Sequence, residues 1–294
     1  MNLNHLNYFK EVCRCGSITA AAEVCHISQP SITSAIGNLE IETGLHLFNH
    51  AGNRLTLTED GNAFLNLTLN FLNSYDDYIK SIADISEHNS TLLKLGVPSV
   101  LGTFIFGKII PLFEKEHPNI KLEIFEIASI DGINMLKKNE LDCMIAISDG
   151  NVPDMISHPL FETELRLAVS KANPLARETL ITKDILKRTP LTIISKGSYH
   201  YDAITRMYPD LNLNVVMHSN QVSTIRRLLL NDNVATIIYK EVFEDDERIV
   251  NIPLEKSIPA RISVFRQNDR YCSKSLQTFI SFISRQLSDV GIKK

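Results

Sequence analysis

The sequence predicts a multidomain chain of the α + α/β class, organised in three successive parts. Residues 1–58 contain closely spaced helical patterns followed by a short strand-like stretch. Residues 59–90 contain one long helical pattern with a seven-residue apolar repeat, and residues 91–294 alternate strand and helix patterns. Because alternating strands and helices are typical of a sheet covered by helices, we expect an α/β domain in the last part.

The first predicted helix ends at Gly16, and its inner face carries an apolar residue about once per turn. These apolar positions are Leu3, Leu6, Phe9 and Cys13. Ser17 and Ser28 stand where the N-caps of two further helices belong, because a serine hydroxyl accepts a hydrogen bond from a first-turn N–H. Pro30 lies in the first turn of the later helix, where the missing N–H does no harm.

The two helices that follow Gly16 are joined by the short turn 25–28, so they cannot lie flat side by side. Helices connected in this way cross as a helix-turn-helix and present the N-terminal turn of the second helix outward. Small and amide side chains there can reach base edges and phosphates in a DNA major groove. The predicted DNA-contacting residues of this motif are Thr19, Gln29, Pro30, Ser31, Thr33 and Ser34.

A strand-like stretch with turn residues follows the helix-turn-helix. Gly44, Gly52 and Asn53 mark turns, and residues 54–57 alternate polar and apolar side chains. This pattern predicts a wing, with Arg54 on it as the minor-groove contact.

The run AAAEVCHISQPSITSAIGNLEIETGLHLF, followed by NRLTLTEDG, resembles the DNA-binding domain of LysR-type transcriptional regulators. The length of the chain and its later α/β pattern also fit that family, so the resemblance covers the whole sequence. It implies a winged helix-turn-helix, a long linker helix that dimerises, and a C-terminal two-lobed α/β domain similar to periplasmic binding proteins. It also implies double-stranded operator DNA and a small-molecule effector as partners, and a homodimer or a homotetramer built as a dimer of dimers.

Residues 1–58 are poor in basic side chains for a DNA-binding domain. They contain Lys10, Arg14 and Arg54 against Glu11, Glu23, Glu40 and Glu42, three positive charges against four negative. The family usually has arginine where this chain has Ala20 and Ser34, and basic residues near Gly37 and Asn38. Lys and Arg side chains at phosphates dominate affinity for DNA, so the small number of basic residues leaves an alternative function open. In that alternative the chain is a ligand-binding module whose helical N-terminal domain mediates protein interaction.

The long helical pattern runs to about residue 87, which gives a helix of about 43 Å. A small domain cannot cover that length, and the seven-residue apolar repeat is typical of a coiled-coil seam. The predicted dimerisation residues are Phe64, Phe71, Tyr75, Tyr78, Ile82 and Ile85. We expect this helix to pair with a second copy of the chain, the alternative being packing on its own domain. Residues 88–91 follow as a short polar hinge.

The last part predicts a mainly parallel sheet covered on both faces. The expected strands are 92–97, 120–127, 141–147, 165–169, 191–194, 215–218, 234–239 and 258–265, and the expected helices are 101–117, 130–138, 182–188, 198–207, 221–230 and 274–287. We expect lobe 1 at about 91–160 and 270–294 and lobe 2 at about 161–269. The chain would cross between the lobes around 160–170 and again near 266–272.

Open α/β sheets bind ligands at the carboxyl ends of their strands, and clefts between lobes are favoured sites. Polar residues at these strand ends are the predicted effector-binding residues, namely Ser99, Ser129, Ser195, Lys196, Ser198, Tyr199 and Gln221. Because lysine provides the one fixed charge among hydroxyls and an amide, we expect a small organic acid or a polar neutral metabolite. The alternative is that these serines only cap helices.

Enzyme signatures are missing from the sequence, which has no P-loop, GxSxG, HExxH or CxxC motif. We therefore expect no enzyme and no cofactor. Cys13, Cys15 and Cys25 cluster in sequence beside His26, but Cys25 lies on an apolar helix face, so we expect packing and no metal site.

Five cysteines, an odd number, argue against a disulfide framework, and a redox switch between Cys143 and Cys272 is the minor alternative. The N-terminus lacks the pattern of a signal peptide, and no apolar run is long enough to span a membrane. We therefore expect a cytoplasmic protein.

Overall fold

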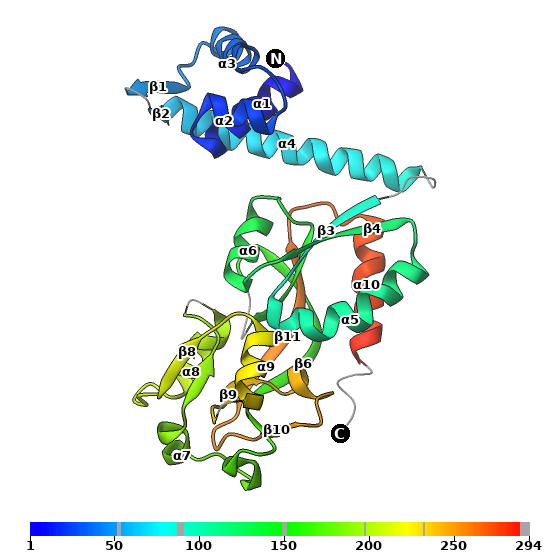
Figure 1. Cartoon of the computed structure of the whole chain (residues 1–294). Helices are drawn as coiled ribbons and strands as arrows, with labels where there is room; N and C mark the ends of the chain where they lie inside the picture. The colour runs from blue at the N-terminus through cyan, green and yellow to red at the C-terminus, as the bar shows by residue number, and fades with distance from the viewer. Residues whose placement is uncertain (52–53, 87–90, 149–151, 197, 232, 289–294) are drawn as a thin grey trace. The chain divides into compact units, whose positions relative to one another are not determined.

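The computed structural model describes residues 1–51, 54–86, 91–148, 152–196, 198–231 and 233–288. The chain divides into two compact units, Met1–Ile85 and Ser86–Lys294, each with its own core (Figure 1). Among the described residues, no helix combines the length and the apolar character needed to cross a membrane.

The N-terminal unit contains four helices and a two-stranded sheet among its described residues. They are α1 (Leu3–Cys15), α2 (Ile18–Val24), α3 (Gln29–Thr43), β1 (Phe48–Ala51), β2 (Arg54–Leu57) and α4 (Glu59–Ile85). The predicted caps are confirmed, since Ser17 accepts from the N–H of Ala20 and Ser28 from that of Ser31. Gly16 ends α1 with a φ of 63°, a left-handed conformation that glycine adopts without strain.

The core of this unit is built around Phe9 of α1. Its ring lies 5.6 Å from that of Phe48 and 5.2 Å from that of Phe64, measured between centroids, so the start of α4 belongs to the same core. Gly61 in the first turn of α4 allows this close approach, because a Cβ there would lie 2.1 Å from the carbonyl oxygen of Leu47. The α4 helix is therefore anchored at its N-terminal end.

The C-terminal unit is built on a seven-stranded sheet of order β10-β6-β11-β5-β3-β4, with β9 also paired to β6. Its strands are β3 (Thr91–Val97), β4 (Ile120–Glu126), β5 (Cys143–Ser148), β6 (Met155–Ser170), β9 (Thr236–Tyr239), β10 (Ile249–Ile252) and β11 (Ile258–Gln267). A separate two-stranded sheet pairs β7 (Leu191–Ile193) with β8 (Val215–His218). A bridge between Leu191 of β7 and Ala235, the residue before β9, links the two sheets.

The prediction of a mainly parallel sheet is wrong for the seven-stranded sheet. Among the described strands of this sheet, only β3–β4 and β3–β5 pair in parallel. The β6 and β11 strands pair antiparallel with each other, β11 also with β5, and β6 also with β9 and β10. A crossover helix forces two strands into parallel directions, and α5 and α8 do this for β3–β4 and β7–β8. No such direct crossover connects β6 to β11. The alternation of strands and helices in the sequence therefore does not determine whether these two strands run parallel or antiparallel.

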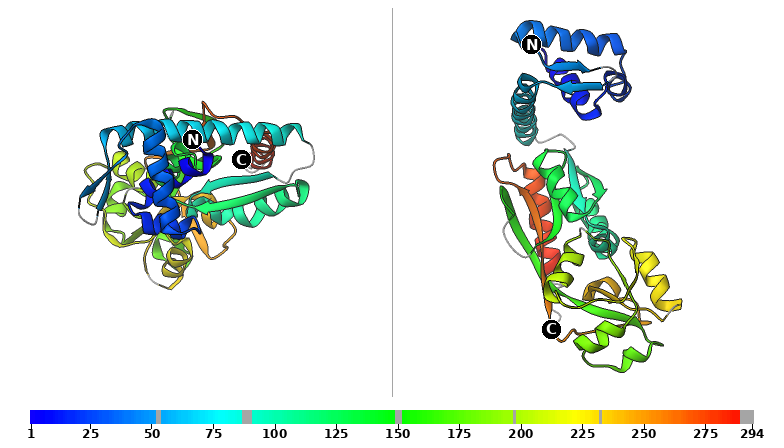
Figure 2. Two further views of the ribbon diagram at one scale, coloured as in Figure 1. Left: turned by 90° about the horizontal axis from the view of Figure 1, so that it is seen from above. Right: turned by 90° about the vertical axis from the view of Figure 1, so that its left-hand side faces the viewer.

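The helices of this unit agree with the predicted ones to within a few residues. They are α5 (Ser99–Glu116), α6 (Ser129–Lys137), α7 (Lys183–Arg188), α8 (Tyr199–Met207), α9 (Val222–Asn231) and α10 (Lys274–Ser288), with 3-10 turns η1 (Pro174–Arg177) and η2 (Lys240–Phe243). Figure 2 shows α10 lying along the sheet, where it packs against β6 and α5. Phe113 of α5 meets Phe279 of α10 with ring centroids 5.1 Å apart.

The long strands β6 and β11 run the length of the sheet. The β5 strand pairs with residues 261–265 of β11, whereas β9 and β10 pair with residues 165–170 of β6. The register between β6 and β11 shifts at Ile262 and Ser263, within the stretch of β11 that pairs with β5. The division into lobes at residues 160 and 270 stays a prediction.

Candidate DNA-binding surface and effector site

The α2 and α3 helices are joined by a turn of four residues, Cys25–Ser28. His26 adopts a φ of 55° in this turn, and the N–H of Ile27 donates to the carbonyl of Ala22. The left-handed conformation of His26 and this hydrogen bond close the turn against the end of α2. The α3 helix then buries one face in the core and leaves the other exposed, the buried residues being Ile32, Ala35, Ile36 and Leu39.

The six predicted DNA contacts of the helix-turn-helix are all exposed. Thr19 Oγ1 of α2 donates to Gln29 Oε1 of α3 at 3.4 Å, which brings Thr19 to the N-terminal turn of α3. Pro30, Ser31, Thr33 and Ser34 occupy the turns that follow. The structure therefore gathers these residues on one surface, while the side chain of Arg54 lies outside the described part of the chain.

Basic side chains contribute little free positive charge to the DNA-binding part of this unit. Lys10 Nζ lies 3.7 Å and Arg14 Nε 2.6 Å from the carboxylate of Glu11, so one acid neutralises part of both charges. Surface ion pairs of this kind are weak, but they compete with DNA phosphates for the same side chains.

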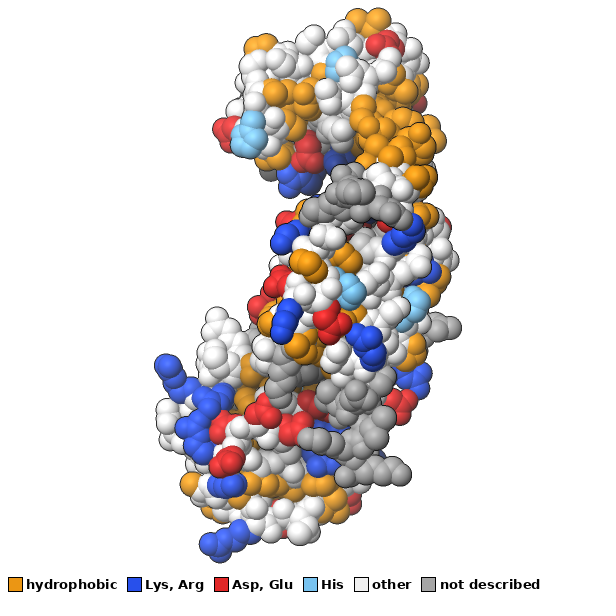
Figure 3. Space-filling view, turned by 90° about the vertical axis from the view of Figure 1, so that its right-hand side faces the viewer, with side chains coloured by type: hydrophobic (Ala, Val, Ile, Leu, Met, Phe, Trp, Pro, Cys, Tyr) orange, Lys and Arg blue, Asp and Glu red, His pale blue; other side chains and the backbone are white. Residues whose placement is uncertain are grey.

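From Leu67 onward, α4 exposes a row of apolar side chains, and Figure 3 shows apolar side chains gathered on the N-terminal unit. The exposed members of the predicted seam are Phe71, Tyr75, Tyr78, Ile82 and Ile85, and Leu67 and Ile79 extend it. Phe64 is different, because it is 8% exposed and packs on Phe9. The prediction that Phe64 lies in the dimer seam is therefore wrong, since its own domain already covers it.

The predicted effector residues fall into two groups at the carboxyl ends of strands. Ser99 and Ser129 begin α5 and α6, directly after the parallel neighbours β3 and β4, and both are half-buried. Ser195, Lys196, Ser198, Tyr199 and Gln221 follow β7 and β8. The α5 helix packs against α9 and η2, so the elements that carry the two groups are in contact.

Hydrogen bonds organise the second group. The N–H of Ser195 donates to Asn220 Oδ1 at 3.1 Å, which joins the end of β7 to the end of β8. Ser198 Oγ donates to the carbonyl of Ser195 at 2.8 Å and accepts from the N–H of Tyr201 at 3.1 Å. Ser198 therefore caps α8, which agrees with the alternative that these serines only cap helices. Ser195 contributes its backbone carbonyl to this cap and not its hydroxyl. Lys196 is exposed and lies 6.0 Å from the ring centroid of Tyr201.

Two polar residues near these strand ends were not predicted from the sequence, namely Glu241, which is half-buried, and His200, which is buried. Glu241 of η2 accepts a hydrogen bond from Thr163 of β6 at 2.5 Å, and burial raises the pKa of its carboxyl. His200 of α8 donates from Nε2 to the carbonyl of Ile237 at 2.5 Å. Glu241 directly follows the predicted strand end at Lys240, which was the available signal, but it lies in an acidic run that reads as a solvated surface.

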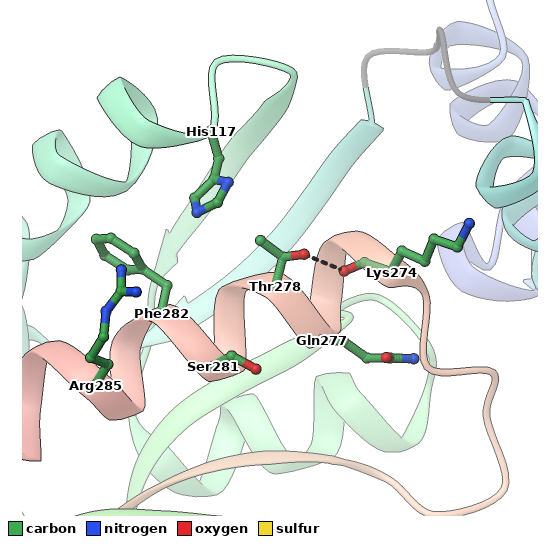
Figure 4. Close-up of a pocket in the computed structure, with 7 residues that line it drawn as sticks. All are labelled: His117, Lys274, Gln277, Thr278, Ser281, Phe282 and Arg285. Carbon is green, nitrogen blue, oxygen red and sulfur yellow. Dashed lines mark hydrogen bonds between the residues drawn. The ribbon is translucent and has the colours of Figure 1, made fainter.

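A shallow groove of about 470 Å³ lies along α10, away from these residues (Figure 4). Its lining is polar and basic apart from Phe282, and consists of His117, Lys274, Gln277, Thr278, Ser281, Phe282 and Arg285. Arg285 pairs with Glu116 at 3.1 Å, so part of the positive charge is already balanced. None of the predicted effector residues lines this groove.

Three of the five cysteines have a raised pKa, which keeps their thiols protonated. Burial raises the pKa of Cys13 to about 12, that of Cys25 above its usual value, and that of Cys143 well above it. A protonated thiol is a poor nucleophile and a poor metal ligand. Within the described ranges, no three residues among His, Cys, Asp and Glu come close enough to hold a metal ion.

Two family models match the chain, one for each unit. Residues 3–62 match bacterial regulatory helix-turn-helix proteins of the lysR family, and residues 86–288 match the LysR substrate binding domain. The latter match covers more than half of the chain.

Full-length relatives and structures resemble the chain from end to end. The HTH-type transcriptional regulator YcgK of Bacillus subtilis is 25% identical, over 97% of this chain and 94% of its own. TdcA of Escherichia coli, also an HTH-type transcriptional regulator, is 23% identical over 98% and 97% of the two chains. The crystal structure of full-length CbnR complexed with its target DNA has the same fold, with a TM-score of 0.64 and 16% identity over 97% of this chain and 99% of that one. The chain therefore belongs to the LysR family, as a helix-turn-helix transcriptional regulator with a C-terminal substrate-binding domain.

Proposed function

We propose that this LysR-type regulator contacts operator DNA through the outward face of α3 and through Arg54, and that a small polar metabolite in the C-terminal unit controls it. The exposed polar surface at the N-terminal end of α3, fixed by the Thr19–Gln29 contact, is the observation that carries the DNA-binding part. The exposed apolar seam of α4 supports a homodimer, assembled further as a dimer of dimers. We assign residues 1–58 to DNA binding, 59–90 to the linker and 91–294 to effector sensing.

The mechanism is a shift between two arrangements of the regulator, biased by the effector. A ligand shifts such an equilibrium only as far as its affinities for the two states differ. The two groups of strand-end residues come from two different sheets, one from the seven-stranded sheet and the other from the two-stranded sheet of β7 and β8, so a molecule held by both would favour one arrangement. We further propose that the protein acts in the cytoplasm and catalyses no reaction, which its transcriptional-regulator relatives support.

Binding to the upstream region of its own gene should weaken only gradually as salt increases. Each phosphate neutralised by Lys or Arg contributes a slope of about −0.9 to log K against log salt, and two of the three basic side chains of the domain pair with Glu11. Arg54→Ala should weaken binding to every sequence and reduce the slope by about one per copy. Arg14→Ala is the matched control and should change neither the affinity nor the salt slope. Fluorescence anisotropy measures both quantities.

A slope that corresponds to eight or more phosphate contacts per dimer would contradict this account of the surface. A wild-type chain that binds no DNA at low salt would instead favour the alternative, a ligand-binding module whose N-terminal domain contacts another protein. The net negative charge of residues 1–58 is the observation that keeps this alternative in the test.

The effector response should depend on Ser99 and Ser195. Removing either hydroxyl should weaken the response to the cognate metabolite by about 1–2 kcal/mol, the usual loss for a hydrogen bond to a charged or polar group. A thermal-shift screen of small carboxylates and neutral polar metabolites identifies the ligand, and titration of the Ser99→Ala and Ser195→Ala proteins measures the loss. Ser223→Ala, an exposed serine in α9, is the control. If all three variants respond like the wild type, these serines are only structural.

A further inference from the structure

The α3 helix has no basic residue, and its two acids are already engaged. Its charged residues are Glu40 and Glu42. Glu40 Oε1 accepts the N–H of Leu47 at 2.7 Å, and Glu42 pairs with the amino group of Met1. The exposed side chains that remain are neutral, namely Gln29, Pro30, Ser31, Thr33, Ser34, Asn38 and Ile41. Any recognition of bases by this helix must therefore use amides, hydroxyls and methyl groups.

Hydrogen bonds within the unit decide which of these groups are available. Thr33 Oγ1 donates to the carbonyl of Gln29 at 3.1 Å, and Ser31 Oγ is hydrogen-bonded to Ser28 Oγ at 2.7 Å. Gln29 itself accepts from Thr19. The amide of Asn38 makes no hydrogen bond to any described residue, so both its donor and its acceptor remain free for a base edge.

Ser34, Asn38 and Ile41 form one row along the exposed face, at positions i, i+4 and i+7. The row is about 10 Å long, or about three base-pair steps of 3.4 Å. Ile41 is 81% exposed, which is unusual for an isoleucine in a helix. Beside the row, a Cβ added at Gly37 would meet no atom within 4 Å, so the glycine leaves the backbone of α3 uncovered for close approach.

Each base pair presents a different set of hydrogen-bonding and methyl groups in the major groove, and the amide and apolar side chains of α3 complement only some of them. Arg and Lys recognise guanine through O6 and N7, Asn and Gln recognise adenine through N6 and N7, and apolar groups contact the methyl group of thymine. We propose that α3 reads A·T base pairs, with Asn38 bonded to one adenine and with Ile41 and the Thr33 methyl group against thymine. The proposal rests on the proposed DNA-binding role of α3 and adds the identity of the bases that it recognises.

Selection of duplexes from a fully randomised library with the full-length protein tests the proposal. The selected sites should contain A·T pairs where α3 contacts them, and a G·C pair there should weaken binding about 10- to 100-fold. Asn38→Ala should lose the same factor on the selected site and no longer distinguish A·T from G·C at one position. Asn38→Arg should move the preference at that position to G·C. Asn66→Ala, an exposed asparagine in α4, is the matched control and should keep the wild-type preference.

Each outcome separates the proposal from the function on which it rests. Selected sites with G·C at the position governed by Asn38, or an Asn38→Ala protein with unchanged sequence preference, would overturn the reading of A·T pairs while leaving DNA binding intact. No enrichment of any sequence by the wild type would overturn both. Alanine in an exposed helical position favours the helix, so loss of binding by Asn38→Ala would not reflect unfolding.

Discussion

Replacing Tyr78 and Ile85 together with glutamate should convert the protein from a dimer into a monomer that fails to hold operator DNA. The two side chains are 62% and 80% exposed in the N-terminal unit and lie seven residues apart on α4. Pairing with a second copy would bury both, and burying an ionised carboxylate without a partner costs several kcal/mol. Loss of the second DNA-binding unit should lower the apparent affinity by roughly 10²–10⁴-fold. Sedimentation at micromolar concentration and a gel shift measure the two effects.

The opposite side of the same helix provides a matched control. Asn66 and Asn73 are also seven residues apart, but they lie roughly 200° around the helix axis from Phe64 and Phe71. Asn66→Glu with Asn73→Glu adds the same charge and should leave a dimer that binds DNA like the wild type. A monomeric wild type, or a Tyr78→Glu, Ile85→Glu protein that remains dimeric, would contradict the seam.

The N-terminal unit was predictable from the sequence because its signals are local. Ser17 and Ser28 cap helices with hydroxyls that reach only three residues ahead, and Gly16 and Gly44 end helices through their own backbone conformation. The same locality explains the error at Phe64. A seven-residue repeat reports which side of α4 is apolar, but it cannot report that Phe9 covers the first turns of that side.

The sheet of the C-terminal unit was less predictable, because its order depends on contacts between distant residues. The β6 strand continues for 16 residues, yet polar side chains such as His158, Glu162 and Glu164 interrupt its apolar pattern. The two acids are tolerated because Glu162 pairs with Arg261 on β11 and Glu164 with Arg166. Glu241 illustrates the same limit at the candidate site, since only the fold brings its carboxyl to the hydroxyl of Thr163.

His200 connects the effector region to the core of the C-terminal unit and should make that unit sensitive to acid. It is 3% exposed, its ring lies 5.1 Å from that of Tyr239, and its buried Nδ1 has no hydrogen-bond partner among the residues that the structure describes. Burial lowers the pKa of His200 from 6.5 to about 4, because a charged imidazolium would lose its hydration there. The hydrogen bond to the carbonyl of Ile237 acts in the opposite direction and only partly offsets this.

The free energy of unfolding of the C-terminal unit should therefore fall as the pH decreases from about 6.5 to about 4. In this window the unfolded chain binds a proton at His200 and the folded chain does not, so stability increases with pH. The difference between 6.5 and about 4 corresponds to about 3 kcal/mol, at about 1.4 kcal/mol per pKa unit. Urea unfolding followed at several pH values measures the loss.

Comparison of two histidine variants isolates this contribution from other titrating groups. His158 has a lowered pKa and acts in the same direction as His200, whereas the raised pKa of Glu241 acts in the opposite direction. His200→Gln keeps an amide donor for the carbonyl of Ile237 but cannot titrate, so its stability should fall less between pH 6.5 and 4. His218→Gln replaces an exposed histidine of β8 and should retain the wild-type pH dependence. Equal pH dependence in the wild type and His200→Gln would show that the buried imidazole is not the source of acid sensitivity.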